Sequence, residues 1–435
     1  MDGNAILDYV PEANPYSSFV NGQKFALVPS FKFECGIILT DATVAYKTWG
    51  RLNATGDNCL VVCHALSGSS DISDWWGPLL GPGEAFDTSR YLVFCANVLG
   101  SPYGTTSCLS VNPETGRIYG PDFPETTIRD DVQLHKLVLD ALGVTKVAAV
   151  VGGSMGGMAT LEWPLCTPQG YINAIVPIST SVDHDAWGIS WAEAQRQCVF
   201  ADPVFDDGYY DPTPAGQPAS GLAAARMVAM LTYRSSPSFS ARFGRGPATD
   251  RGSKTLSPKK VEASRVENGL ARRKEENPKF TAQSYLQYQG QKFVNRFDAN
   301  CFIHLTRKMD HHDISRGRIP QHSSASVKTS REVDLKTVLS RAPPKSLVVG
   351  IASDVLFTPE QQEVLVNSLP EAELVMIPSR EGHDGFLLEF EVLSPLITDF
   401  LRERCPEIYD GEPLNRESDQ GDVVKNSVFG EVEAG

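Results

Sequence analysis

The sequence contains no apolar run that approaches the ~20 residues of a membrane-spanning helix. Residues 1–12 also lack the basic and apolar segments of a secretory signal peptide. Basic residues are in deficit, with 39 Lys and Arg against 53 Asp and Glu and a formal charge of −14. Because such a charge repels nucleic acid and anionic membrane surfaces, we expect neither as a partner. We expect a cytoplasmic protein.

Metal-binding patterns are missing as well. The nine cysteines are scattered without a Cys-x-x-Cys pair, and His311 and His312 are adjacent rather than spaced along one face of a helix. An odd number of cysteines in apolar surroundings predicts reduced, mostly buried thiols. Since a metal site needs clustered ligands, we expect no metal.

The sequence does contain a Gly-x-Ser-x-Gly pattern around Ser154, within the stretch Val147–Met158. The apolar run before the pattern predicts a buried parallel strand, and the residues after it predict a helix. Gly152 and Gly156 would let the strand and the helix approach closely, which exposes the serine hydroxyl at the corner. The backbone N–H of Met155 would favour a developing oxyanion. The alternative is a purely structural turn.

Buried strands alternate with helices around Ser154. This order predicts right-handed crossovers in a parallel sheet, preceded by a short antiparallel meander. The predicted parallel strands are 58–64, 91–97, 146–151, 174–177, 346–351 and 373–377, the meander strands 31–33, 37–39 and 43–46, and the helices 128–142, 159–166, 359–368 and 385–402.

Two loops in this pattern point to function. A loop of small residues follows the strand 58–64, upstream of Ser154, where an α/β hydrolase takes its second oxyanion-hole donor. We assign this role to the backbone N–H of Leu66, with an ordinary strand-to-helix turn as the alternative. The loop 99–124 is too long for a simple connector, which predicts that it lines a site.

From residue 185 to residue 330 the strands stop, and helical periodicity takes over at 187–200, 222–231 and 284–308. The sequence therefore predicts an α/β-hydrolase fold: a mostly parallel sheet flanked by helices, with an inserted helical cap. The predicted divisions are a surface arm at 1–23, the α/β domain at 24–184 and 331–403, the cap at 185–330 with a flexible insertion at 235–280, and an acidic, loosely ordered tail at 404–435.

A serine hydroxyl becomes a nucleophile when a base accepts its proton. Ser154, Asp354 and His383 stand in the chain order of an α/β-hydrolase triad, and each follows a predicted parallel strand. We predict that His383 takes the serine proton while Asp354 accepts a hydrogen bond from the other ring nitrogen. Alternatively, Asp354 caps the next helix. Asp384 is badly placed to orient His383, and we expect it to face the substrate.

These residues lie in segments that together resemble the homoserine O-acetyltransferase family, over roughly residues 27–401. Segments of the predicted cap share in the resemblance, whereas plain esterases would share only the triad. The segments are His64–Gly68, Gly152–Met158, Leu231–Arg234, Phe297–Asn300, His312–Gly317, Ser353–Asp354 and Gly382–Leu387.

The resemblance implies a ping-pong reaction. Ser154 takes the acetyl group from acetyl-CoA, and the side-chain hydroxyl of L-homoserine then attacks the acetyl-enzyme with His383 as base. Acetyl-CoA is thus a co-substrate, and no cofactor is expected to stay bound. The family's amino-acid-binding Arg and Asp map to Arg226 and Asp384, whose charges suit an α-carboxylate and an ammonium group. Tyr233 would line the same pocket, and analogy with the family implies a homodimer.

The acceptor remains open at this point. Ser67, in the expected pocket, stands where Thr is common in the family, and 235–280 is an insertion as in fungal members. Relatives acetylate L-serine or deacetylcephalosporin C, and others use succinyl-CoA. Homoserine and serine differ by one methylene, worth only about 1–3 kcal/mol in a pocket. An esterase or thioesterase and an inactive binding protein of this fold are further alternatives, and Arg226 by itself would also fit a surface charge.

Overall fold

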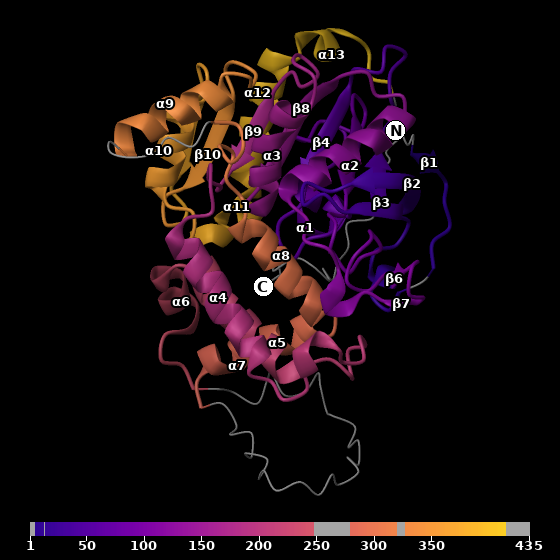
Figure 1. Cartoon of the computed structure of the whole chain (residues 1–435). Coiled ribbons are helices and arrows are strands. Elements are labelled where there is room, and N and C mark those ends of the chain that lie inside the picture. Colours follow the sequence, from indigo (N-terminus) through magenta and orange to yellow (C-terminus); the bar gives the residue numbers. More distant parts are fainter. Residues whose placement is uncertain (1–4, 13, 248–278, 320–326, 415–435) are drawn as a thin grey trace, which may run out of the picture.

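The computed structural model contains a nine-stranded sheet in the order β1-β2-β3-β5-β4-β8-β9-β10-β11 (Figure 1). The structure describes residues 5–12, 14–247, 279–319 and 327–414. The strands from β5 to β11 in this order run parallel, whereas β1, β2 and β3 pair antiparallel with their neighbours. The predicted mostly parallel sheet is therefore confirmed. The parallel strands are β5 (Leu92–Ala96), β4 (Cys59–Cys63), β8 (Val147–Gly153), β9 (Ile175–Ile178), β10 (Leu347–Ile351) and β11 (Glu373–Ile377).

The predicted meander of three short strands is instead one long hairpin. Its strands are β2 (Lys24–Lys32) and β3 (Ile38–Trp49), and β1 (Ile6–Leu7) adds to its outer edge. Pairing continues on both sides of Asp41, whose φ of 56° marks a local irregularity inside β3. The two segments predicted as separate strands are therefore one strand.

Helices cover both faces of the sheet, and its central strands are therefore buried on both sides. All seven residues of β8 are buried. One apolar core joins the sheet to α2 (Ile128–Ala141), α3 (Met155–Cys166), α9 (Val327–Leu339) and α10 (Pro359–Ser368). A second core, on the opposite face, joins it to α1 (Ile72–Trp75) and α12 (Phe390–Arg404).

A group of helices is inserted between β9 and β10, and Figure 1 shows it gathered at one end of the sheet. The group comprises α4 (Ala186–Phe200), α5 (Ala219–Tyr233), α6 (Ser236–Phe243), α7 (Thr281–Val294) and α8 (Ala299–Asp310). Helix α6 lies inside the stretch predicted as a flexible insertion, and the remainder of that stretch from 248 to 278 lies outside the described residues. The proposed division into domains stays a prediction.

Two helices predicted as continuous are each divided. The segment 284–308 forms parts of α7 and α8, because Asp298 begins a new helix by accepting a hydrogen bond from the N–H of Cys301 at 3.0 Å. The segment 385–402 forms α11 (Gly385–Leu388) and α12, separated at Glu389, whose ψ of 52° is not helical. Apolar periodicity continued across both breaks, so it did not reveal them.

The ends of the described chain are more tightly packed than predicted. In the arm 1–23, Tyr16 is fully buried, and its neighbourhood belongs to the main core. In the tail, Cys405 is fully buried, α13 (Pro406–Asp410) follows it, and Arg90 donates from Nη1 to the carbonyl of Ile408 at 2.9 Å. Each segment is polar in its overall composition, and this composition did not indicate the individual anchoring residues. Residues 415–435 of the predicted tail lie outside the described residues.

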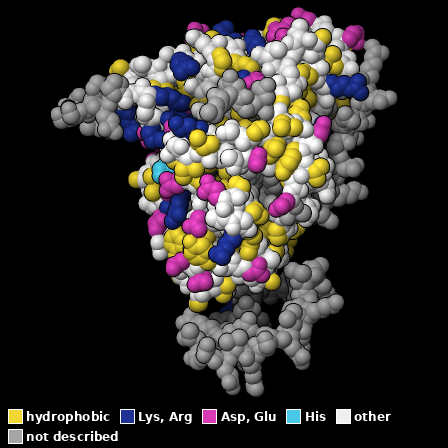
Figure 2. All heavy atoms as spheres, turned by 45° about the vertical axis from the view of Figure 1, so that its right-hand side comes forward, with side chains coloured by type: hydrophobic (Ala, Val, Ile, Leu, Met, Phe, Trp, Pro, Cys, Tyr) yellow, Lys and Arg dark blue, Asp and Glu magenta, His cyan; other side chains and the backbone are white. Residues whose placement is uncertain are grey.

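No helix in the described part of the chain is long and apolar enough to cross a bilayer. Figure 2 shows acidic, basic and apolar side chains on one face of the molecule, with basic side chains gathered toward its upper left.

Candidate active site

Ser154 occupies the corner between β8 and α3, where the sequence predicted a sharp turn. Its backbone has φ 58° and ψ −126°, a sparsely populated conformation that costs about 1–3 kcal/mol in a non-glycine residue. Hydrogen bonds fix it on both sides: its N–H donates to the carbonyl of Ile178 at 3.0 Å, and its own carbonyl accepts from Oγ1 of Thr180 at 2.8 Å. These hydrogen bonds thus hold the strained serine at the start of the helix.

The two glycines of the motif allow α3 to contact the sheet. A Cβ on Gly156 would lie 2.1 Å from the carbonyl oxygen of Cys63, and a Cβ on Gly152 would lie 2.3 Å from that of Gly156. Both contacts involve backbone atoms, so a side chain at either position would push the helix away from β4 or β8.

Asp354 follows β10 and His383 follows β11, and the two side chains form a buried pair. Nδ1 of His383 lies 2.7 Å from Oδ2 of Asp354, and the two residues are only 3% exposed. Because an ionised carboxylate only accepts, Nδ1–H must donate, which leaves Nε2 as the basic nitrogen. The rings of Phe357 and Phe386 lie 5.2 and 5.1 Å from the imidazole, centre to centre. These contacts hold the imidazole in one orientation.

The other oxygen of Asp354 has a structural task. Oδ1 accepts from the N–H groups of Leu356 and Phe357 at 2.8 and 2.9 Å, which closes the turn after β10. The following helix α10 has Thr358 as its N-cap. The alternative that Asp354 caps this helix is therefore wrong, because the carboxylate caps the preceding turn instead.

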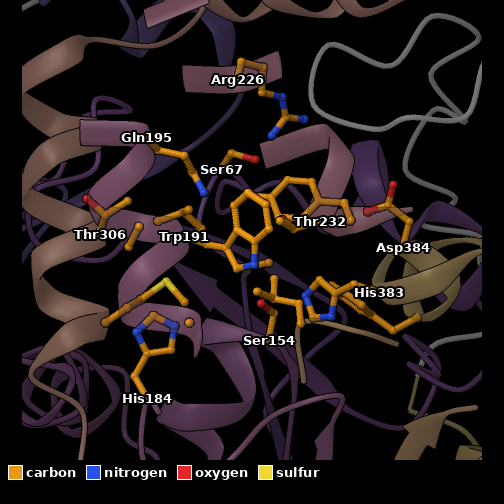
Figure 3. A pocket seen from close by; sticks show the side chains of 18 of the residues that line it. Ser67, Ser154, His184, Trp191, Gln195, Arg226, Thr232, Thr306, His383 and Asp384 are labelled. Carbon is orange, nitrogen blue, oxygen red and sulfur yellow. The ribbon is translucent and has the colours of Figure 1, made fainter. Parts of the chain in front are cut away.

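One pocket between the inserted helices and the sheet contains Ser154 and His383. Figure 3 shows their side chains next to each other at one end of it. Of the other predicted residues, Leu66, Ser67, Arg226, Tyr233 and Asp384 also line this pocket. Among the residues assigned to the site, Met155 and Asp354 do not line the pocket, and Asp354 is connected to it through His383.

The backbone N–H groups of Met155 and Leu66 are the predicted donors of the oxyanion hole. The side chain of Met155 lines an internal cavity behind the corner, so only its backbone could serve the pocket. As the first residue of α3, it presents one of the N–H groups for which a helix has no internal acceptor. Leu66 follows β4 in a turn closed by the N–H of Gly68 and the carbonyl of Ala65 at 2.9 Å. Both oxyanion roles stay predictions.

Arg226 is a buried pocket residue and not a surface charge. It is 5% exposed, and its guanidinium carbon lies 5.0 and 5.3 Å from the ring centres of Phe293 and Tyr233. Both aromatic faces stabilise the cation while it stays out of water. Figure 3 shows it at the end of the pocket away from Ser154.

Asp384 lies beside a cation of the protein itself. Its Oδ2 is 2.8 Å from Nε of Arg234, and both side chains are nearly buried, although the N–H is not aligned for a hydrogen bond. Arg234 also pairs with Glu381. The expected contact of Asp384 with the substrate stays a prediction.

His184, Trp191, Gln195 and Thr306 are among the pocket residues that have no counterpart in the sequence predictions. They lie on or next to α4 and on α8. Trp191 and Gln195 are one helical turn apart, a spacing that equally fits residues of a core. The sequence alone therefore does not distinguish these pocket residues from residues that pack in a core.

The loop 99–124 does not line this pocket in the described part of the chain, and whether it lines a functional site stays a prediction. It lines a second cavity with residues of α8 such as His304. At its start, Leu99 is held by the fully buried Lys308, whose Nζ donates to the Leu99 carbonyl and to Asp131, both at 2.7 Å. The length of a loop indicates that it has a task but not which cavity it serves.

Among the described residues, no group of three or more His, Cys, Asp or Glu could hold a metal ion. The nine cysteines, all within the described ranges, are free thiols, and most are partly or fully buried.

The parallel sheet, the serine at a strand-to-helix corner and the buried His–Asp pair define an α/β hydrolase, and residues 58–390 match the model of the α/β-hydrolase fold family. The chain is 44% identical to a homoserine O-acetyltransferase of Cryptococcus neoformans, covering 98% of this chain and 97% of the relative. It is 43% identical to that of Saccharomyces cerevisiae, with 98% and 96% covered, and 44% identical to that of Schizosaccharomyces pombe, with 97% and 95% covered. The chain belongs to the homoserine O-acetyltransferase family.

Solved structures share the fold. A homoserine O-acetyltransferase from Bacillus anthracis is similar with a TM-score of 0.72 and 21% identity, covering 88% of this chain and 98% of that one. An acetylester hydrolase from Corynebacterium glutamicum is similar with a TM-score of 0.71 and 22% identity, covering 90% and 100%. Because a transferase and a hydrolase fit equally well, the fold alone does not decide between them.

Proposed function

We propose that this protein transfers the acetyl group of acetyl-CoA to the side-chain hydroxyl of L-homoserine, a step of methionine biosynthesis. The observation that carries the proposal is the identity of 42–44% with homoserine O-acetyltransferases over 97–98% of the chain. The pocket is compatible with it, since Arg226, a cation suited to an α-carboxylate, lies in the same cavity as Ser154.

In the first half of the proposed reaction, Oγ of Ser154 attacks the thioester carbonyl while Nε2 of His383 takes its proton. The backbone N–H groups of Leu66 and Met155 stabilise the oxyanion. Collapse of the intermediate breaks the C–S bond, and His383 returns the proton to the departing CoA thiolate. Asp354 stabilises the imidazolium throughout.

In the second half, the hydroxyl of L-homoserine attacks the acetyl carbonyl on Ser154. His383 takes the hydroxyl proton and passes it to Oγ of Ser154, which restores the free enzyme. Arg226 holds the α-carboxylate, and Asp384 accepts from the ammonium group. Ser67 and Tyr233 complete the pocket around the amino acid.

The test is steady-state release of CoA thiol from acetyl-CoA with L-homoserine, L-serine, deacetylcephalosporin C or no acceptor. Fast release only with L-homoserine is expected. A preference for L-serine or deacetylcephalosporin C would change the acceptor and keep the mechanism. Equal release without any acceptor would indicate an esterase or thioesterase and remove the substrate roles of Arg226 and Asp384. Succinyl-CoA, tested in parallel, is expected to be a poor donor.

We also propose that the protein acts in the cytoplasm as a homodimer. The support is analogy with the family, whose members commonly pair through cap helices. Gel filtration with light scattering at micromolar concentration should give twice the chain mass of 47.4 kDa. A monomer mass would remove the dimer.

A further inference from the structure

The C-terminal end of α5 lies directly on the loop that carries His383. A Cβ on Gly382 would lie only 2.6 Å from the backbone nitrogen of Ser235 and 2.7 Å from the carbonyl carbon of Arg234. The backbone of Gly382 also has a φ of 70°, which favours glycine. This position therefore allows two backbone segments to touch, one from the inserted helices and one from the sheet.

Polar contacts connect the same two segments. Oγ of Ser235 donates to the carbonyl of Arg380, and Oγ of Ser238 donates to Oε2 of Glu381 at 2.7 Å. From the sheet side, the N–H of Gly382 donates to Oγ of Ser353 at 2.9 Å, next to Asp354. The loop is thus attached both to α5–α6 and to the residue that precedes Asp354.

Arg234 occupies the centre of this contact. It is 6% exposed, and it pairs through Nη1 with Glu381 and through Nε with Asp384, two carboxylates that flank His383 in the chain. The side chain of Asp384 is only 4% exposed. Without the guanidinium, both carboxylates would lose their shared cation, and the charge of Asp384 would stay nearly out of water, which is costly. The loop would then have to move.

Arg234 does not itself line the pocket in the described part of the chain, whereas Thr232 and Tyr233 just before it do. The tyrosine ring lies 6.0 Å from the imidazole of His383, centre to centre. Any effect of Arg234 on the reaction must therefore pass through the loop and not through contact with substrate.

We propose that Arg234 is a positioning residue, which bridges Glu381 and Asp384 and thereby holds His383 in line with Ser154. The inference rests on the proposed role of His383 as the base. It also gives α5 two tasks, since the helix that supplies Arg226 to the pocket ends on the loop of the base.

The test compares Arg234→Met and Arg234→Lys with the control Arg318→Met. Arg318 likewise pairs with a buried carboxylate, at 2.6 Å from Oε2 of Glu162, and lies outside the pocket. For each variant, kcat and KM for L-homoserine, kcat for hydrolysis of p-nitrophenyl acetate, and the midpoint of thermal unfolding are measured. The ester needs Ser154 and His383 but no amino-acid acceptor.

Arg234→Met should lower kcat for both substrates about 100-fold, the effect of a misplacement of ~1 Å, with KM for L-homoserine changed less than about threefold. Arg234→Lys can reach one carboxylate at a time, so it should recover about tenfold of the loss. Arg318→Met should keep kcat within about threefold of the wild-type value, although its unfolding midpoint should be similar to that of Arg234→Met.

Three outcomes would overturn the inference. A raised KM at unchanged kcat in Arg234→Met would make Arg234 a substrate-binding residue. An equal loss of kcat in Arg318→Met would reduce its role to general stability. If Arg234→Met does not fold, wild-type kcat in Arg234→Lys would have the same consequence. A wild-type enzyme that turns over the ester but transfers nothing to L-homoserine would refute only the proposed function.

Discussion

Asp354 binds two elements with its two carboxylate oxygens: Oδ2 accepts from Nδ1 of His383 at 2.7 Å, while Oδ1 accepts from the N–H groups of Leu356 and Phe357. One side chain thereby sets the imidazole tautomer and closes the turn after β10. The two functions can be separated by mutation to Asn. The amide oxygen can still accept from the N–H groups of the turn, but the amide nitrogen cannot accept a hydrogen bond from the imidazole.

Asp354→Asn should lower kcat about 10⁴-fold with little change in stability, because the amide favours the wrong histidine tautomer. Asp354→Ala should lose a similar factor and, in addition, about 1–3 kcal/mol of unfolding free energy, since two buried N–H groups lose their acceptor. CoA release and urea unfolding measure the two effects. Equal stability of both variants would contradict the second function.

Gly156→Ala should destabilise the protein by at least about 1–3 kcal/mol, because its Cβ would lie 2.1 Å from the Cys63 carbonyl and α3 would have to shift. The control is Gly77→Ala, where a Cβ meets nothing within 4 Å and a change within about 0.5 kcal/mol is expected. Urea unfolding gives both values. A neutral Gly156→Ala would show that the helix can move away from β4 freely.

Gln195→Ala should raise KM for L-homoserine about tenfold, the loss of roughly one hydrogen bond of ~1.4 kcal/mol. Gln195 is 6% exposed and lines the pocket, and Figure 3 shows its amide directed inward. The first burst of CoA release, before the acceptor enters, should not change. Gln197→Ala, at an exposed position of the same helix, is the control. An altered burst in Gln195→Ala would assign the residue to the acetyl donor.

Stability should fall as the pH is lowered from about 6.5 to about 4, in part through His64. Burial lowers the pKa of His64 from 6.5 to about 4. Its Nδ1 donates to the carbonyl of Ala65 at 2.8 Å and its Nε2 accepts from the N–H of Val98 at 3.1 Å, so the ring must stay neutral. The unfolded chain binds the proton first, and protonation therefore favours unfolding.

Because of its lowered pKa, neutral His64 contributes about 3 kcal/mol to the free energy of unfolding, and this contribution is lost as the pH falls through that range. Urea unfolding of His64→Gln at several pH values should show a flatter dependence than the wild type. His311→Gln, at an exposed histidine, serves as the control and should keep the wild-type slope. An unchanged slope in His64→Gln would mean that other groups carry the acid sensitivity.

Much of the α/β framework was predictable because it depends on short patterns. The apolar run before Ser154 became β8, and the predicted 359–368 helix and 373–377 strand match α10 and β11 in both bounds. Predictions failed where one residue outweighs the average of its segment. Asp298 divides α7 from α8, and Tyr16 anchors an otherwise polar arm.

The sequence by itself determined the corner at Ser154, since its glycines and apolar run act within a dozen residues, and it ordered Ser154, Asp354 and His383 along the chain. Only the tertiary structure decided which side chains share the pocket. Gln195 reaches the pocket because α4 packs over the sheet, and Arg234 meets Glu381 across 147 positions of the chain. Such contacts depend on how the inserted helices pack against the sheet, and no local pattern encodes that packing.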